Sequence, residues 1–139
     1  MKEQTGRGTI LSEIDLRLFI PLVLNTILLH VVVLLTRLGA TYRGLEIGLS
    51  VVAIGVIAAS FSLLPAILAV PVGRFIDRGH DALAIWIGSA LSLVSAIGFV
   101  LIPSNAVTLS LNTAVMGVGQ LAYMAGHQMV SVRAAKGQR

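Results

Sequence analysis

The sequence predicts an all-α membrane protein with four transmembrane helices, and two observations carry this prediction. Apolar residues make up 56% of the 139 residues and charged residues only 12%, whereas soluble domains carry about 25% charged residues. The few charges border four long apolar stretches, and a helix needs roughly 20 residues to cross a hydrocarbon core of about 30 Å. A soluble fold of this composition would expose large apolar patches and aggregate, so lipid is the expected solvent.

The four expected spans follow one another with short connections. They lie at about 18–41, 47–73, 82–102 and 106–132. Residues of the kinds found in turns between antiparallel helices, namely Gly, Pro, Asn and charged residues, occupy the connections. The first span follows 17 residues of mixed charge and has no A-x-A cleavage site after it. We therefore expect a retained helix rather than a signal peptide.

The distribution of basic residues orients the bundle, because Lys and Arg resist translocation and gather on the cytoplasmic side of a membrane. Arg37 and Arg43 lie on one predicted side. The other side holds Lys2, Arg7, Arg17, Arg74, Arg78, Arg133, Lys136 and Arg139. We therefore expect 1–17 to be a cytoplasmic N-terminal segment and 133–139 a cytoplasmic basic tail. The expected location is a plasma membrane, the inner membrane of a bacterium.

Two spans carry a polar stripe on an otherwise apolar helix. In the first span the stripe residues fall within about 60° of one another at 100° per residue; they are Thr26, His30, Arg37 and Thr41. The fourth span repeats the pattern with Thr113, Gln120, Tyr123 and His127. Polar groups at membrane depth are costly and usually face a bundle interior or a watery cavity. His30, Arg37, Gln120, Tyr123 and His127 are therefore candidates to line a substrate cavity.

Simpler roles for these residues stay open. Arg37 can extend to the outer headgroups together with Arg43, since long basic side chains keep their charge in water. His30 and His127 can each form a buried hydrogen bond between helices.

Small residues recur on one face of the second span, within about 40° of one line at 100° per residue. They are Gly55, Ala59, Ser62, Ala66, Ala69 and Gly73. Small residues let helix backbones approach closely in lipid, so the stripe predicts a packing seam. Gly119, Ala122 and Gly126 give the fourth span a second face suited to close packing. Pro65 and Pro71 lie inside the second span and should bend it, because each removes a backbone donor.

The composition also excludes several functions. The chain has no cysteine, which closes thiolate chemistry and disulfides. No Gly-rich phosphate loop, metal-ligand cluster or Ser/His/Asp arrangement rises above chance, and no carboxylate lies clearly at membrane depth. Aromatic residues are only 5% and do not alternate with a basic stripe, so nucleic acid is not an expected partner. We expect neither an enzyme nor a bound cofactor or metal.

The connection between the second and third spans is the most specific segment. It reads Gly73-Arg74-Phe75-Ile76-Asp77-Arg78-Gly79-His80-Asp81. Gly73 can let a neighbouring helix approach, Asp77 can pair with an arginine or with helix N-terminal amides, and Gly79 can let the chain reverse. Because this connection is rich in charged residues, an alternative is that its sole role is to orient the helices in the membrane.

This segment resembles the signature loop of the major facilitator superfamily, whose pattern is Gly, three residues, Asp-Arg, one residue, Gly and then basic residues. Gly73, Asp77 and Arg78 match this pattern. Gly79 comes one position early, and His80 and Asp81 replace the basic residues.

The resemblance implies a transporter of twelve helices that works by alternating access and is built from inverted repeats of three helices. This chain resembles the first third of that fold. A small organic solute or drug would be the substrate, and the remaining helices or a second copy would be partners. Gly73, Arg74, Asp77, Arg78 and Gly79 would form a conformational gate against the second half of the transporter.

Two other readings keep the chain as a self-contained four-helix membrane protein. One is a dimeric small exporter, although the membrane glutamate on which such proteins rely is missing from 18–36. The other is a scaffold that transports nothing and binds partner helices through the small-residue faces.

Overall fold

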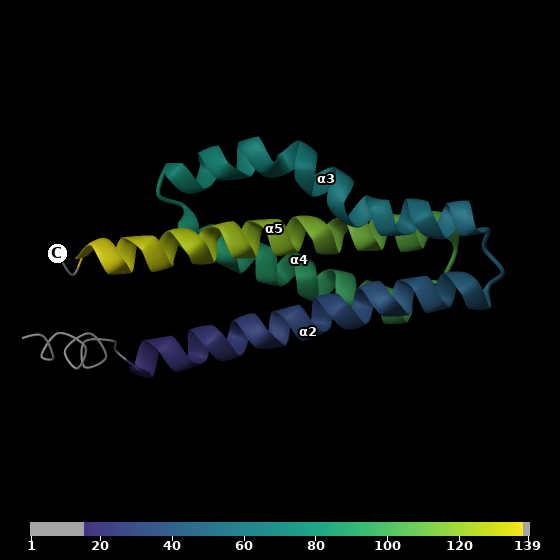
Figure 1. The fold of residues 1–139 in the computed structure, drawn as a ribbon, viewed down its shortest axis with the longest axis horizontal. Helices are drawn as coiled ribbons and strands as arrows, with labels where there is room; N and C mark the ends of the chain where they lie inside the picture. The colour runs from purple at the N-terminus through teal and green to yellow at the C-terminus, as the bar shows by residue number, and fades with distance from the viewer. Residues whose placement is uncertain (1–15, 138–139) are drawn as a thin grey trace, which may run out of the picture. The chain divides into compact units, whose positions relative to one another are not determined.

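The computed structural model describes residues 16–137. These residues form four helices and no strand: α2 (Leu16–Glu46), α3 (Val51–Asp77), α4 (Asp81–Leu101) and α5 (Ala106–Gly137). The all-α prediction is confirmed (Figure 1). Residues 1–15 of the expected N-terminal segment and 138–139 of the expected tail lie outside the described residues.

The chain divides into two compact units at Val31. In its described part, the first unit is the first half of α2. The second begins at Val32 and holds the rest of α2 together with α3, α4 and α5. The following description of packing concerns the second unit.

Three helices extend past the limits that the uncharged runs predicted. α2 continues to Glu46 rather than 41, and α5 continues to Gly137, so that 133–137 of the expected tail are helical. α3 is shifted to Val51–Asp77 from the expected 47–73. Charge ends a membrane span but not a helix, because Arg, Lys and Glu are good helix formers.

The turn chemistry sets where α3 begins. Gly48 has a φ of +72°, a conformation that glycine adopts without steric cost. The Oγ atom of Ser50 then accepts a hydrogen bond from the amide of Ala53 at 3.3 Å. This cap satisfies one of the free amides at the start of the helix.

The surface of the described residues is apolar, unlike that of a soluble protein, while the interior holds some polar side chains. The most buried positions include Ser92, Ser95 and Thr113, each at most 3% exposed. The outer surface is apolar: Val51 is 85% exposed and Trp86 75% exposed. Such a surface is stable in lipid and prone to association in water. The chain is therefore embedded in a membrane.

Among the described residues, three helices are long and apolar enough to cross a membrane: Val23–Glu46 of α2, α3 and α4. The fourth helix, α5, is not one of them. It is the helix that packs against both α3 and α4, and its polar residues Thr113 and Gln120 are turned at least partly inward. A helix buried among others can carry polar groups because they do not face lipid.

Glycines bring α4 and α5 into backbone contact. A Cβ atom placed on Gly88 would lie 2.5 Å from the amide nitrogen of Tyr123 and 2.6 Å from the carbonyl oxygen of Gly119. A Cβ on Gly126 would lie 2.7 Å from the carbonyl oxygen of Asp81. The close-packing face predicted for Gly119, Ala122 and Gly126 is confirmed, since all three are buried.

The seam predicted on α3 does not pack against a described helix. A Cβ atom placed on Gly55 or Gly73 would meet nothing within 4 Å, and Ala59, Ser62, Ala66 and Ala69 are exposed. α3 contacts α5 elsewhere, where Gly117 lies against the carbonyl oxygen of Phe61. Seam residues were chosen by size alone, and size does not decide which face a neighbour covers.

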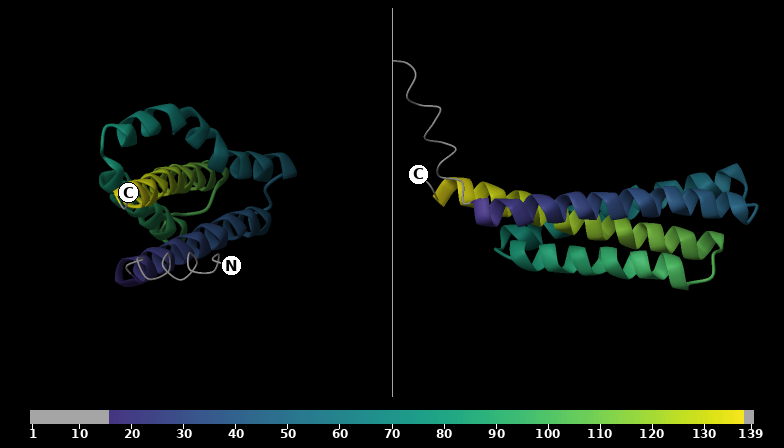
Figure 2. Two further views of the ribbon diagram at one scale, coloured as in Figure 1. Left: turned by 60° about the vertical axis from the view of Figure 1, so that its left-hand side comes forward. Right: turned by 90° about the horizontal axis from the view of Figure 1, so that it is seen from below.

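α3 is bent, as its prolines predict. Pro65 and Pro71 both lie inside the helix. The first half of α3 runs along α5, and its second half arches away before returning toward α4 (Figures 1 and 2). The missing backbone donors at the two prolines account for this curve.

A hydrogen bond from Ser95 crosses the α4–α5 contact, and its loss is a testable change. The Oγ atom of Ser95 donates to the carbonyl oxygen of Asn112 at 2.9 Å. We expect Ser95→Ala to lower the free energy of unfolding by about 0.6 kcal/mol, the average value of such bonds in membranes. Ser92→Ala is the matched control, because the hydroxyl of Ser92 donates within its own helix to Gly88 at 2.9 Å. Reversible unfolding in mixed micelles measures both, and an equal loss would contradict the assignment.

Candidate functional site

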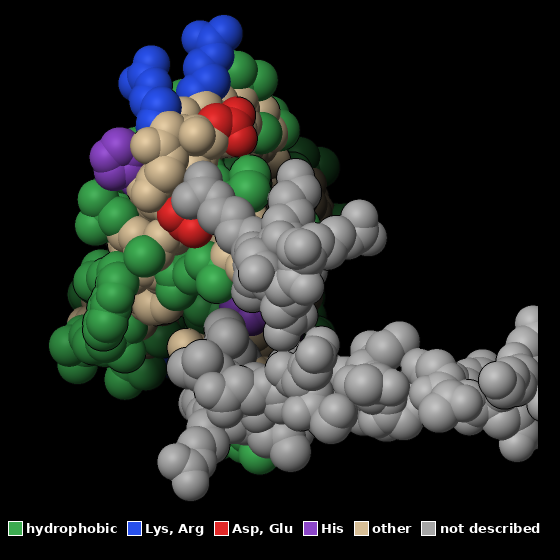
Figure 3. Space-filling model, turned by 90° about the vertical axis from the view of Figure 1, so that its left-hand side faces the viewer, with side chains coloured by type: hydrophobic (Ala, Val, Ile, Leu, Met, Phe, Trp, Pro, Cys, Tyr) green, Lys and Arg blue, Asp and Glu red, His purple; other side chains and the backbone are tan. Residues whose placement is uncertain are grey.

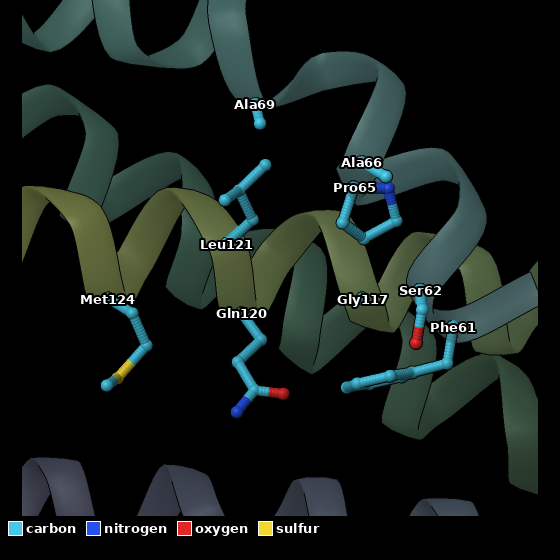
Figure 4. A pocket seen from close by; sticks show the side chains of 9 residues that line it. All are labelled: Phe61, Ser62, Pro65, Ala66, Ala69, Gly117, Gln120, Leu121 and Met124. Carbon is cyan, nitrogen blue, oxygen red and sulfur yellow. The ribbon is translucent and has the colours of Figure 1, made fainter.

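A groove of about 420 Å³ lies between α3 and α5 (Figure 4). Its lining residues are Phe61, Ser62, Pro65, Ala66, Ala69, Gly117, Gln120, Leu121 and Met124. The two helices meet at Gly117, where a Cβ atom would lie 2.9 Å from Cγ of Pro65. Beyond this contact α3 bends away, and the small side chains Ala66 and Ala69 leave the space open.

Gln120 and Ser62 supply the polar side chains of this groove. The Oε1 atom of Gln120 is buried and has no hydrogen-bond partner among the described residues. Figure 4 shows the amide oxygen on the side of Phe61. A buried acceptor left without a donor costs about 1–3 kcal/mol. This cost is removed when a donor from outside the described residues reaches Gln120.

Arg37 reaches the same aromatic ring from α2. Its guanidinium carbon lies 4.3 Å from the centroid of the Phe61 ring, within the range of a cation–π contact. Arg37 also lines a second groove of about 180 Å³ together with Leu34, Leu38, Ala40, Thr41, Ile57, Ala58 and Thr113. Phe61 therefore connects the arginine to the groove that holds Gln120.

The contact with Phe61 bears on the two readings of Arg37. Arg37 comes nine residues before the end of α2 at Glu46, which is about 13.5 Å along the helix. Phe61 comes ten residues after the start of α3 at Val51, about 15 Å from the same end of the bundle. The guanidinium lies over Phe61, which agrees with the cavity reading, and the headgroup reading of Arg37 stays a prediction.

The two polar stripes meet in part. Thr41 from the first stripe and Thr113 from the second both line the groove of Arg37. Their hydroxyls donate within their own helices, Thr41 to the carbonyl of Arg37 at 3.2 Å and Thr113 to that of Leu109 at 2.6 Å. Arg37, Gln120 and the exposed Ser62 are then the side chains of the two grooves that retain polar capacity for another molecule.

The other predicted cavity residues lie elsewhere. Tyr123 is fully buried and stacks on His127 with ring centroids 5.8 Å apart. Neither residue is part of the lining of the two grooves. His30 belongs to the first unit; it is exposed, and its Nδ1 atom lies 2.8 Å from the carbonyl oxygen of Thr26.

Phe61 is the site residue that sequence reasoning missed. Aromatic rings are not polar, so a search for polar stripes passes over them. A usable signal is nevertheless present, because Phe61 is the only aromatic residue between Val51 and Arg74. An isolated aromatic residue level with an arginine on a neighbouring helix is a candidate cation–π partner.

The predicted gate loop is mostly helix. Gly73, Arg74 and Asp77 belong to the end of α3, Arg78 caps it, and α4 starts at Asp81. Only 78–80 form the turn, so the expected connection 73–81 is corrected. Gly79 makes the short turn possible: its φ is +91° and its amide donates to the carbonyl of Ile76 at 2.9 Å. The expected role of Gly79 in chain reversal is confirmed.

Charged side chains gather at this end of the bundle (Figure 3). Arg74 in the last turn of α3 and Asp81 in the first turn of α4 both complement their helix dipoles. Asp77 does not, because it is the last residue of α3, where the dipole is negative. Asp77 is exposed and forms no ion pair with a described residue. Its position is unfavourable for the chain taken by itself.

No group of three or more His, Asp or Glu residues in the described part of the chain could hold a metal ion. The two grooves offer one guanidinium, one amide, the hydroxyls of Ser62, Thr41 and Thr113, and apolar walls. No family model, curated protein or solved structure matches this chain.

Proposed function

We propose that this chain is the substrate-binding part of a transporter of the major facilitator type, which moves a small organic solute or drug by alternating access. The observation that carries the proposal is the groove between α3 and α5, with the unpartnered Oε1 atom of Gln120 in its wall. Ligand sites are concave and largely apolar, with few polar groups that fix orientation. The grouping of Gly73, Asp77 and Arg78 at the end of α3 supports the choice of family.

The proposed orientation places both termini in the cytoplasm of a bacterial cell, with the chain in its inner membrane. Arg74 and Arg78 lie at the end of the bundle where α5 also ends (Figure 1), and basic residues favour the cytoplasmic side. Trp86 and Tyr42 are 75% and 66% exposed near opposite ends of their helices. Both residue types favour the two interfaces of a bilayer.

The exposed small-residue face of α3 favours a second candidate function, a scaffold that binds partner helices. Gly55 has open space around it, and faces of this kind suit helix association in lipid. In the transporter, Gly55 and Ala59, which do not line the groove, would receive the remaining helices or a second copy. Under the scaffold reading the chain binds helices and transports nothing.

The coding DNA downstream of codon 139 separates these two functions. The transporter proposal expects further apolar runs of about 20 residues, enough for eight more spans. A stop without further spans would contradict it and favour the scaffold.

A transport measurement tests the role of Gln120 directly. The protein is expressed from its complete coding region, and membrane vesicles are assayed for uptake of organic solutes. We expect Gln120→Leu to reduce transport at least about tenfold. The substrate would lose its hydrogen bond to the Gln120 side chain and would therefore bind more weakly. Stability should not fall, since the substitution removes a buried acceptor without a partner.

The matched control is Gln128→Leu, two turns further along α5. Gln128 is exposed, and its substitution should leave transport unchanged. Equal effects of the two substitutions would contradict a role for the groove, and vesicles without uptake of any solute would contradict transport itself.

A further inference from the structure

Among the described residues of the second unit, the charged side chains away from the helix ends are positive only. Arg37 lies about 13.5 Å inside the end of α2. The described carboxylates are Glu46, Asp77 and Asp81, all at helix ends. Arg37 forms no ion pair with any of them. A lone arginine at this depth is costly, and a ligand anion would remove that cost.

The geometry of Arg37 suits a planar anion. Its guanidinium carbon lies 4.3 Å from the centroid of the Phe61 ring, and its N–H groups donate to no described residue. Five N–H donors in a fixed fork match the two oxygens of a carboxylate. The exposure of Arg37 and its place in the lining of a groove keep these donors accessible.

The surroundings select a ligand with an apolar body. Leu34, Ile57 and Ala58 line the groove of Arg37, and Phe61, Leu121 and Met124 line the groove of Gln120. Phe61 both contacts Arg37 and lines the groove of Gln120, so the apolar body of a ligand bound at Arg37 can extend along Phe61 toward that groove. Nothing described at this depth would neutralise an organic cation.

From these observations we infer that the solute is an amphipathic organic anion, whose carboxylate pairs with Arg37 while its apolar body lies along Phe61. This inference rests on the proposed function, because it names the substrate class of the same site. It also makes Arg37 a specificity residue that separates organic anions from neutral and cationic molecules of the same shape.

Equilibrium dialysis of three matched probes against the purified chain in phosphatidylcholine nanodiscs tests the inference. The probes are naphthalene-1-acetate, naphthalene-1-acetamide and naphthalene-1-methylammonium, with binding to empty nanodiscs subtracted. We expect the anion to bind at least about tenfold more tightly than the other two, the ratio that one charge-assisted hydrogen bond supplies.

Variants assign the preference to Arg37. Arg37→Gln should lower the affinity for the anion about tenfold to hundredfold and leave the amide unchanged. Arg43→Gln is the matched control on the same helix, because Arg43 lies near the helix end, 6.0 Å from the Phe99 ring. If Arg37→Gln does not fold, Arg37→Lys and Phe61→Leu replace it. Each should reduce the preference for the anion, because lysine lacks the planar set of N–H donors and leucine lacks the aromatic ring beside the guanidinium.

The outcomes are distinct. Equal binding of the anion and the amide, or equal losses in the Arg37 and Arg43 variants, would overturn the inference. Tighter binding of the cation would overturn it as well. Anion binding that depends on Arg37, in a protein that transports no solute in vesicles, would support the anion site and contradict the proposed transport.

Discussion

Replacing Gly88 with alanine is expected to lower the free energy of unfolding by about 3 kcal/mol, because the added methyl group has no space. Its nearest neighbours are the amide nitrogen of Tyr123 at 2.5 Å and the carbonyl oxygen of Gly119 at 2.6 Å. Both are backbone atoms, so no side-chain rotation relieves the overlap. α4 and α5 must separate, which also strains the hydrogen bond between Ser95 and Asn112. Unfolding in mixed micelles, followed by far-UV circular dichroism, measures the loss.

Gly55→Ala is the matched control for this prediction. Gly55 also lies in the middle of a helix, but a Cβ atom there would meet nothing within 4 Å. Alanine favours the helix over glycine by about 0.5–1 kcal/mol, so stability should stay the same or rise slightly. Comparable destabilisation at Gly55 and Gly88 would mean that the α4–α5 contact is not the close approach described above.

The helices could be predicted from the sequence because lipid imposes a simple rule. A run of about 20 uncharged residues must satisfy its backbone internally, and a helix does this. The helix ends could not be predicted in the same way, since Glu46 and Asp77 continue helices that have already left the apolar run. Ends depend on local chemistry, such as the Ser50 cap and the positive φ of Gly79.

The contacts between helices were only partly predictable. Angular arithmetic on α5 identified Gly119 and Gly126 as a tight face, and both meet α4. The same arithmetic identified a stripe on α3 that packs against no described helix and in part lines the groove facing α5. It can group residues on one side of a helix but cannot tell which neighbour covers that side. The buried partners on α4, Gly88 and Ser92, were therefore not identified.

The candidate site was likewise only partly predictable from the sequence. Arg37 and Gln120 belong to polar stripes that the sequence displays, and the structure brings both to Phe61. Tyr123 belongs to the same stripe as Gln120 but is fully buried against α4. In a membrane protein both a packed interior and a cavity collect polar and small residues, so a stripe alone does not distinguish them.

Asp77→Asn is expected to separate function from stability. A carboxylate at the C-terminal end of α3 opposes the helix dipole, and Asp77 has no ion pair with a described residue to offset this. Neutralising it should therefore leave the chain equally stable or stabilise it by about 0.3–1 kcal/mol. Under the proposed function, the same carboxylate pairs with a partner outside the described residues in one state of the transport cycle. Loss of that pair should reduce transport at least about tenfold.

Asp81→Asn is the control, because its expected effect on stability is the opposite of that of Asp77→Asn. Asp81 lies in the first turn of α4, where a carboxylate complements the dipole, so its neutralisation should cost about 0.3–1 kcal/mol. The stability of both variants is measured on the chain in micelles, and transport on the protein expressed from its complete coding region. If Asp77→Asn destabilises the chain as Asp81→Asn does, the carboxylate has a structural role inside this unit. If Asp77→Asn leaves transport intact, Asp77 is not part of a gate. A stable Asp77 variant with impaired transport would show that this carboxylate acts in transport and does not stabilise its own helix.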